Sequence, residues 1–491
     1  MQNRREFLKI CIAGGAALAA GRPEGLCGWP REMMSGVDPQ SQWEGLAEIL
    51  ARIKPPVFPD RDFDITRFGA VGDNRSDCTD AFQKAIAACQ GAGGGRVVVP
   101  TGQFMTGAVH LKSKVNLHLM AGATVRFSRD PGKYPLVFTR WEGVELMNYS
   151  PFIYAFEQAD IAVTGEGTVD GNADCEHWWP WKGRALCGWK QGEPEQVKDR
   201  NLLFDMAERA VPVAERVFGP GHYLRPQFIQ PYRCKNVLIE GVTLKNSPMW
   251  QVHPVLCTNV TVRKMTITGA GANHDAAPNT DGCDPESCTD VLIKDCNFDT
   301  GDDCIAIKSG RNADGRRLAT PCQNIVIQGC HMKEGHGGVT IGSEISGGVR
   351  SVFAENCRMD SPHLDSAVRI KNNAMRGGAL ENIYIRNIDV GQVSTAGLSI
   401  DFYYEEGATG KFTPVVRNVD IRNLVTRKAE YALYLRGFAK APIAGVRLAD
   451  CDFEGVTHPN VIENVTDLTL RNVRINGKLV DGSVNTASNI P

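Results

Sequence analysis

The sequence predicts an all-β protein in which short strands stack into a single-stranded parallel β-helix, a solenoid. The main observation is a phrase that returns from about residue 160 onward: Asn or Asp, apolar, any, apolar, two variable residues, apolar, any, apolar. Copies begin at Asn236, Asn259, Asp290, Asn324, Asn382, Asn418 and Asp467, with looser copies at Ser351 and Gly445. The alternation has a period of two, which is typical of strands. Because one such unit cannot bury its apolar face alone, the copies must stack.

A second observation tests this stacking. The position five residues after each first apolar residue is always apolar or cysteine, as an inward-facing column requires; it is occupied by Val242, Met265, Cys296, Cys330, Cys357, Ile388, Leu424, Cys451 and Val473. We therefore expect the four cysteines of this column to be small buried hydrophobic residues and neither disulfide partners nor metal ligands. Cys283 and Cys288 fall in a loop and could pair. The repeated Asn residues, such as Asn236, Asn259 and Asn324, are expected to be structural.

The front of the solenoid has a predicted cap. Between Asp77 and Ala88 one helical stripe carries apolar residues, and it consists of Ala81, Phe82, Ala85, Ile86 and Cys89. Gly91 and Gly93 to Gly95 then end the helix. A short amphipathic helix here would cover the open apolar end of the stack.

The first residues predict export. Arg4-Arg5 followed by Phe7-Leu8-Lys9 and a Gly/Ala-rich stretch resembles a twin-arginine signal, with a cleavage site near Ala17-Leu18-Ala19. We expect residues 1–20 to be this signal, residues 21–59 to be a linker or extension, and residues 60–480 to form one β-helix domain. The expected location is the periplasm or the exterior.

Composition excludes two function classes. The chain has 54 Lys and Arg against 56 Asp and Glu, a net charge of −2, so no basic surplus indicates a nucleic-acid surface. No apolar run reaches the ~18 residues of a membrane span.

Four short motifs carry the chemistry: Asn279-Thr280-Asp281, Gly301-Asp302-Asp303, Gly335-His336-Gly337 and Arg369-Ile370-Lys371. Asp281 and Asp302 are separated by about one coil, so the three aspartates can share one face. Mutual repulsion raises at least one of their pKa values, which gives a proton donor beside an ionised base. Arg369 and Lys371 alternate around Ile370, so both cations share a face and could bind an anionic sugar.

In this order the four motifs resemble glycoside hydrolase family 28, the polygalacturonases, and the cap resembles that of the pectin-degrading right-handed β-helices. The resemblance extends over residues 60 to 475 and implies hydrolysis of α-1,4 bonds between galacturonates with inversion, and no metal or organic cofactor. Inversion generally needs an acid and a base roughly 6.5–9.5 Å apart.

The resemblance also assigns roles. Asp302 would be the general acid, Asp281 and Asp303 would hold and deprotonate the attacking water, and His336 would tune the acid. Arg369 and Lys371 would bind a galacturonate carboxylate, and Asn279 is a further candidate substrate contact. A looser match, Gly397 to Ile400 followed by Tyr404, would add a substrate-contacting tyrosine.

Other functions remain open at this stage. The aspartates could form a calcium site of a polysaccharide lyase, the substrate could be rhamnogalacturonan or another decorated pectin, or the β-helix could bind sugar without catalysis. The oligomeric state is not predicted.

An insertion at about 172–225 interrupts the coils. It contains four of the eight tryptophans (Trp178, Trp179, Trp181 and Trp189), and Gln196 to Phe218 is predicted to be helical with a kink or break at Pro212. The tryptophans could anchor the insertion, or the insertion could close one end of a substrate groove and stack sugars. Closure predicts an exo-acting enzyme, whereas an open groove predicts an endo-acting one.

Overall fold

The computed structural model describes residues 39–183, 187–269 and 277–484. The predicted export signal, residues 1–20, lies outside them. The chain divides into two compact units, Met1–Ala47 and Glu48–Pro491. Helix α2 (Pro39–Arg52) runs from the first unit into the second, inside the stretch expected to be an extension. The remaining description concerns the second unit.

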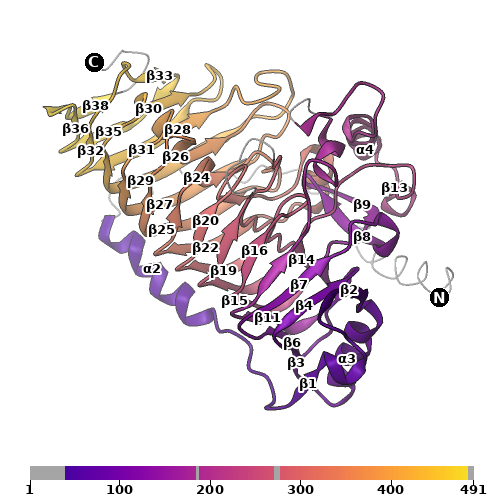
Figure 1. Ribbon diagram of the computed structural model, residues 1–491. Coiled ribbons are helices and arrows are strands. Elements are labelled where there is room, and N and C mark those ends of the chain that lie inside the picture. The colour runs from indigo at the N-terminus through magenta and orange to yellow at the C-terminus, as the bar shows by residue number, and fades with distance from the viewer. Residues whose placement is uncertain (1–38, 184–186, 270–276, 485–491) are drawn as a thin grey trace, which may run out of the picture. The chain divides into compact units, whose positions relative to one another are not determined.

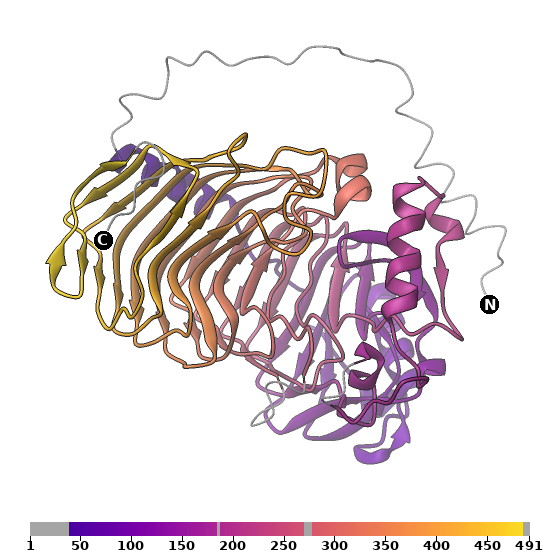
Figure 2. The same cartoon turned by 90° about the horizontal axis from the view of Figure 1, so that it is seen from above.

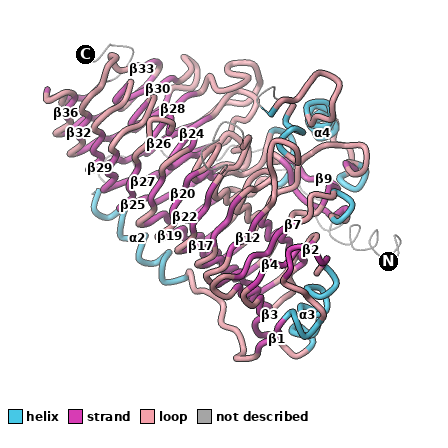
Figure 3. The backbone as a smooth tube through the Cα atoms, in the orientation of Figure 1, coloured by secondary structure: helices cyan, strands magenta, loops and turns pink. Residues whose placement is uncertain are grey.

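The second unit is a right-handed parallel β-helix, as predicted (Figures 1 and 3). Each coil contributes strands to up to three ladders. The first ladder consists of β1 (Asp62–Asp64), β3 (Gly95–Val99), β6 (Val115–Leu119), β11 (Ala159–Gly165), β15 (Lys235–Glu240), β17 (Thr258–Arg263), β19 (Thr289–Lys294), β22 (Cys322–Gln328), β25 (Val349–Met359), β27 (Ala379–Val390), β29 (Val415–Thr426), β31 (Ile443–Ala449) and β35 (Leu468–Arg471).

The second ladder follows a bend in each coil. It consists of β2 (Asp73–Asp77), β4 (Gly102–Thr106), β7 (Ala123–Phe127), β12 (Thr168–Asp170), β16 (Thr243–Lys245), β18 (Thr266–Thr268), β20 (Asn297–Asp299), β23 (His331–Met332), the ends of β25, β27 and β29, β32 (Asp452–Phe453) and β36 (Arg474–Ile475).

The third ladder carries the candidate site. It begins with β5 (Val109–His110), β10 (Ile153–Phe156) and β14 (Ile229–Tyr232), continues through the bridged residues Val252 and Cys283, and ends with β21 (Ile305–Ile307), β24 (Gly335–Ile341), β26 (Leu364–Lys371), β28 (Ala396–Asp401), β30 (Tyr431–Arg436) and β33 (Val461–Glu463). Short strands β34 (Val465–Thr466), β37 (Lys478–Leu479) and β38 (Gly482–Val484) complete the C-terminal end.

The repeated phrase has the predicted register. Its first apolar residues are aligned from coil to coil and are buried; they are Val237, Val260, Val291, Ile325, Val352, Ile383, Val419 and Val446. The column five residues later is at most 2% exposed at every position, including the four cysteines. Cys283 and Cys288 are buried free thiols and do not pair.

The repeated Asn or Asp has a structural cause. At each of these corners the backbone adopts a left-handed conformation, with φ between 55° and 61°, which Asn and Asp tolerate better than most residues. The side chains then form a ladder along the stack: Asn259 donates to Asn236 at 2.8 Å and Asn324 donates to Asp290 at 2.8 Å. These residues are structural, as expected.

The cap is the predicted helix. α3 (Thr79–Gly91) buries Ala81, Phe82, Ala85, Ile86 and Cys89 and packs against the first strands. It lies at the N-terminal end of the stack, next to β1 (Figure 1).

The insertion is only partly as predicted. α4 (Val197–Glu208) ends four residues before Pro212, and residues 209–218 contain a 3₁₀ turn, Val213–Glu215, and strand β13 (Val217–Phe218) in place of a continued helix. β13 pairs with β9 (Val144–Tyr149) of an antiparallel hairpin with β8 (Leu136–Trp141), which the sequence analysis missed. α4 lies outside the coils (Figure 2) and shares a small apolar core with this hairpin.

The other short helices lie between strands. They are the 3₁₀ turns Ile65–Phe68, Pro131–Lys133 and Trp179–Lys182, and α5 (Asn312–Leu318). Among the described residues no helix has the length and apolarity needed to cross a membrane.

Candidate active site

The candidate site lies at the third ladder, where four consecutive coils align. Gly301–Asp303 immediately precede β21, His336 lies near the start of β24, and Arg369 and Lys371 lie at the end of β26. Cys283, Ile305, Val339 and Val368 are in register, so the four motifs lie on neighbouring coils about 4.8 Å apart. Ile370 points into the core, and its neighbours Arg369 and Lys371 therefore point outward.

The three predicted aspartates come together. One carboxylate oxygen from each of Asp281, Asp302 and Asp303 lies within 4.8 Å of the others. Asp281 and Asp303 are buried, whereas Asp302 is partly exposed. Between these oxygens the separation is shorter than the 6.5–9.5 Å expected above for the acid and the base, because adjacent coils bring the motifs within one coil spacing.

Asp302 is paired with His336. The imidazole Nδ1 lies 2.8 Å from Asp302 Oδ1. The charge of Asp302 raises the pKa of His336 to about 9. Burial would raise the pKa of Asp302, but the charge and hydrogen bond of His336, together with the charges of Lys371 and Lys308, outweigh it and hold that pKa well below its usual range. At neutral pH the unliganded pair is thus an imidazolium donating a hydrogen bond to a carboxylate.

Asp281 behaves in the opposite way. Burial, followed by the charges of Asp284 and Asp302, raises its pKa well above the usual range. Asp284 is also fully buried beside it, and burial raises its pKa to about 8. Between them, these two carboxyls hold at least one proton at neutral pH. Burial, together with the repulsion predicted from the sequence, therefore keeps a proton on this pair, and not on Asp302, in the unliganded protein.

Asp303 contacts the two predicted sugar-binding cations. Lys371 Nζ donates to Asp303 Oδ2 at 2.6 Å, and Arg369 Nη1 lies 3.8 Å from Asp303 Oδ1. Burial would lower the pKa of Lys371, but Asp303 and Tyr404 together raise it above its usual value. The Tyr404 ring centre lies 5.8 Å from the Arg369 guanidinium and 5.2 Å from Lys371 Nζ. Three of the four predicted binding residues, Arg369, Lys371 and Tyr404, thus lie on the aspartates' side of the sheet.

Asn279 joins the site to the insertion. Its Nδ2 donates to Asp302 Oδ2 at 3.3 Å. Its Oδ1 accepts hydrogen bonds from Lys182 at 2.7 Å and from Arg225 at 2.8 Å. Because two cations hold the oxygen, the amide nitrogen is directed at Asp302.

The sequence analysis missed Lys308, a buried cation behind the aspartates. Its Nζ lies 3.6 Å from both Asp281 and Asp284 and 3.1 Å from Glu344, and 4.3 Å from the ring centre of Trp250. Burial would lower the pKa of Lys308, but Glu344 and the aspartates raise it well above its usual value. Lys308 directly follows the apolar strand β21, and a lysine at the end of a buried strand was the sequence feature that could have indicated it.

The aspartates could in principle ligate a cation, because oxygens this close are suitable for one. Their charge is already offset by Lys308, Lys371, Arg369 and His336, each within 4 Å of one of them.

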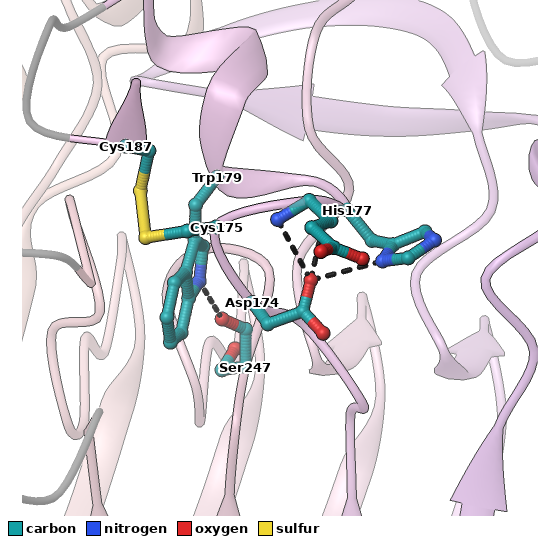
Figure 4. Close-up of a disulfide and its surroundings, with 7 residues drawn as sticks. Asp174, Cys175, His177, Trp179, Cys187 and Ser247 are labelled. Carbon is teal, nitrogen blue, oxygen red and sulfur yellow. Dashed lines mark hydrogen bonds and ion pairs between the residues drawn. A yellow bond between two sulfur atoms is a disulfide. The ribbon is translucent and has the colours of Figure 1, made fainter. Parts of the chain in front are cut away.

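The insertion tryptophans divide into two kinds. Trp179 Nε1 donates to the Ser247 carbonyl at 2.9 Å (Figure 4). Trp178 and Trp179 are 2% and 6% exposed, so these two anchor the insertion. Trp181 and Trp189 are only partly buried. A disulfide between Cys175 and Cys187, not predicted from the sequence, closes the loop that contains Trp178, Trp179 and Trp181.

A parallel β-helix with clustered carboxylates and flanking cations on one sheet defines a class of acid/base enzymes that act on polysaccharides. Residues 221–477 match the family described as glycosyl hydrolases family 28, and the chain belongs to this family. The solved structure of a hyperthermoactive exopolygalacturonase from Thermotoga maritima is 44% identical, covers 90% of this chain and 99% of its own, and superposes with a TM-score of 0.85.

Two sequence relatives agree with this assignment. A probable polygalacturonase of Vitis vinifera is 29% identical over 78% of this chain and 72% of its own length. An exo-poly-alpha-D-galacturonosidase of Dickeya chrysanthemi is 26% identical over 85% of this chain and 74% of its own.

Proposed function

We propose that this chain is an exo-acting polygalacturonase that hydrolyses α-1,4 bonds between galacturonates at a chain end. The observation that carries the proposal is the cluster of Asp281, Asp302 and Asp303 beside Arg369 and Lys371. It combines an acid/base carboxylate set with cations that match an anionic sugar.

In this mechanism the Asp302–His336 pair is the general acid. The transferable proton rests on His336 Nδ1, 2.8 Å from Asp302 Oδ1. A bound sugar removes water from the pair, which disfavours two separated charges and favours a neutral imidazole beside a protonated carboxyl. Asp302 then protonates the glycosidic oxygen.

Asp281 and Asp303 hold and deprotonate the attacking water. The charge of Asp302 is one cause of the raised pKa of Asp281. Moving the proton onto Asp302 removes that repulsion and makes the ionised form of Asp281 less costly. Lys308 stabilises the same carboxylate from behind. The acid and the base are therefore coupled through one proton.

The insertion supports exo action. Lys182 and Arg225 contact Asn279 on the coil that precedes Asp302, and Arg200 of α4 pairs with Glu142 at 2.7 Å. An insertion fixed this close to the acid would block one end of the substrate groove. Only the end of a polysaccharide chain could then enter on that side. The similarity to the Thermotoga exopolygalacturonase and to the Dickeya exo-poly-alpha-D-galacturonosidase also supports exo action.

We further propose that the protein is exported, with residues 1–20 as the signal, residues 21–59 as an extension and residues 60–480 as the catalytic domain. The Cys175–Cys187 disulfide supports an oxidising compartment.

The test is a time course of products from unesterified polygalacturonate, with and without a chelator, separated by size. Early galacturonic acid or its dimer beside long polymer is expected. A ladder of oligomers would retain the chemistry but overturn exo action. Ultraviolet-absorbing, chelator-sensitive products would replace hydrolysis with elimination, and activity on rhamnogalacturonan alone would change the substrate.

Product stereochemistry tests the mechanism separately. We expect proton NMR of fresh digests to show the β-anomer first, since a water attacks opposite the leaving group. The close spacing of the aspartate oxygens makes this informative, because initial α-anomer would indicate a covalent intermediate.

A further inference from the structure

The loop closed by the Cys175–Cys187 disulfide reaches the candidate active site. Trp178 and Trp179, which are buried, hold its middle. Just before the loop, Asp174 accepts hydrogen bonds from the backbone and the ring of His177 at 2.9 Å (Figure 4). The loop continues through the 3₁₀ turn Trp179–Lys182. The loop is thus fixed at several points just before Lys182.

Lys182 and Arg225 both donate to Asn279, but they differ in burial. Arg225 is fully buried, and it also donates to the carbonyls of Pro248 and Pro278 at 2.8 and 2.6 Å and to Gln196 at 3.0 Å. These bonds join the end of the insertion to the coils. Lys182 is only partly buried, and its ammonium is 2.7 Å from Asn279 Oδ1.

Lys182 approaches Asp302 from a different coil than the predicted sugar-binding cations Arg369 and Lys371. Arg369 and Lys371 come from the coils that follow Asp302, whereas Lys182 reaches Asn279 on the coil that precedes it. A bond between two galacturonates has one carboxylate on each side. We expect Arg369 and Lys371, which share strand β26, to bind one of these two carboxylates.

We propose that Lys182 is a specificity-determining residue that binds the carboxylate of the terminal sugar, on the other side of the scissile bond from Arg369 and Lys371. This inference rests on the proposed function. It assigns the insertion two tasks, because the same loop that limits the site to a chain end also recognises that the end is acidic. Lys182 is only partly buried, so a carboxylate of the substrate can approach its ammonium beside Asn279.

Calorimetric titration with galacturonic acid and with galactose, which lacks the carboxylate, tests the inference without turnover. Lys182→Met is expected to raise the Kd for galacturonic acid about tenfold, the loss of a charge-assisted hydrogen bond. The Kd for galactose should change less than twofold. Lys182→Arg should restore most of the binding of galacturonic acid.

Lys190→Met is the matched control, because it removes the same charge from an exposed position of the same insertion. It should bind both sugars as the unaltered protein does. Equal losses for both sugars in Lys182→Met, or no loss for either, would show that Lys182 only anchors the loop. If Lys182→Met fails to fold, the comparison is made with Lys182→Gln.

The two proposals can fail separately. If the unaltered protein releases no galacturonic acid from polygalacturonate, the proposed function is wrong whatever the titrations give. If it releases galacturonic acid but Lys182→Met binds that sugar normally, only the role of Lys182 is wrong.

Discussion

At the scale of single residues, the site depends on how four charged groups share protons. Asp302 and His336 form one neutral pair, and Asp281 with Asp284 forms another set that retains a proton. Because each set carries a proton that offsets part of its negative charge, several carboxylates can lie together in a largely buried site. The shared protons also mean that changing one partner alters the others.

Asp302→Asn tests the assignment of the acid. We expect turnover of polygalacturonate to fall by about 10³-fold or more, because an amide cannot donate the proton that the leaving oxygen needs. Circular dichroism should be unchanged, since Asp302 is partly exposed. Asp389→Asn, on β27 and paired with Arg427 away from the site, should keep full activity. Retention of most activity in Asp302→Asn would show that another group is the acid.

The pH profile tests the role of His336. Its pKa is raised to about 9, so the pair keeps its transferable proton below that pH and loses it above. We expect kcat/KM to fall as the pH rises through about 9. In His336→Gln the proton must reside on Asp302 itself, so the alkaline limb should move to lower pH. An unchanged alkaline limb in this variant would contradict the shared-proton mechanism.

At the scale of elements, the disulfide loop joins stability to function. Cys175 and Cys187 are separated by 12 residues, and closing such a loop is worth about 3 kcal/mol in the chain-entropy account. Cys175→Ser with Cys187→Ser should lower the urea midpoint of the transition that includes the insertion.

The control for this prediction is to measure the urea midpoints of the unaltered protein and of the double variant with and without reductant. Reductant should lower the midpoint of the unaltered protein toward that of the double variant and leave the variant unchanged. An equal response of both proteins would mean that reductant acts elsewhere, and no response of either would mean that the disulfide adds no stability.

The sequence could predict some elements better than others. The column from Val242 to Val473 and the stripe of α3 were correct because burial alone determines their pattern. The helix expected over Gln196 to Phe218 was wrong beyond Glu208, where β13 pairs with the hairpin strand β9. That pairing joins segments far apart in the chain, and local periodicity does not contain it.

The same distinction holds within the site. The four motifs are local phrases, and the coil spacing predicts that they meet. Lys308, Glu344 and Lys182 come from outside those phrases, and their contacts depend on side-chain directions that the repeat does not specify. The disulfide was missed because cysteine positions alone do not determine pairing.

At the scale of the whole molecule, a stack of coils has an open end that must be covered. Phe82 of α3 is 1% exposed and belongs to the main core. Phe82→Ala should cost about 3–5 kcal/mol of unfolding free energy, because it leaves a cavity at that end.

The control for the cap is Gln83→Ala, on the exposed side of the same helix, which should stay within about 0.5 kcal/mol of the unaltered protein. Denaturant unfolding followed by far-ultraviolet dichroism measures both. A mild effect of Phe82→Ala would mean that the helix contributes little to the stack. An uncovered first coil also presents unpaired strand edges, so light scattering of the variant is expected to rise.

The distribution of cysteines implies that the coils should fold before the disulfide forms. Among the described residues, twelve thiols are free and buried, and one pair is bonded. In an extended chain all of them would be equally open to oxidation, and wrong pairs would outnumber the right one. Once the coils have formed, the buried thiols are shielded from oxidants. The protein should therefore refold well in reductant followed by air, and poorly when oxidant is present from the start.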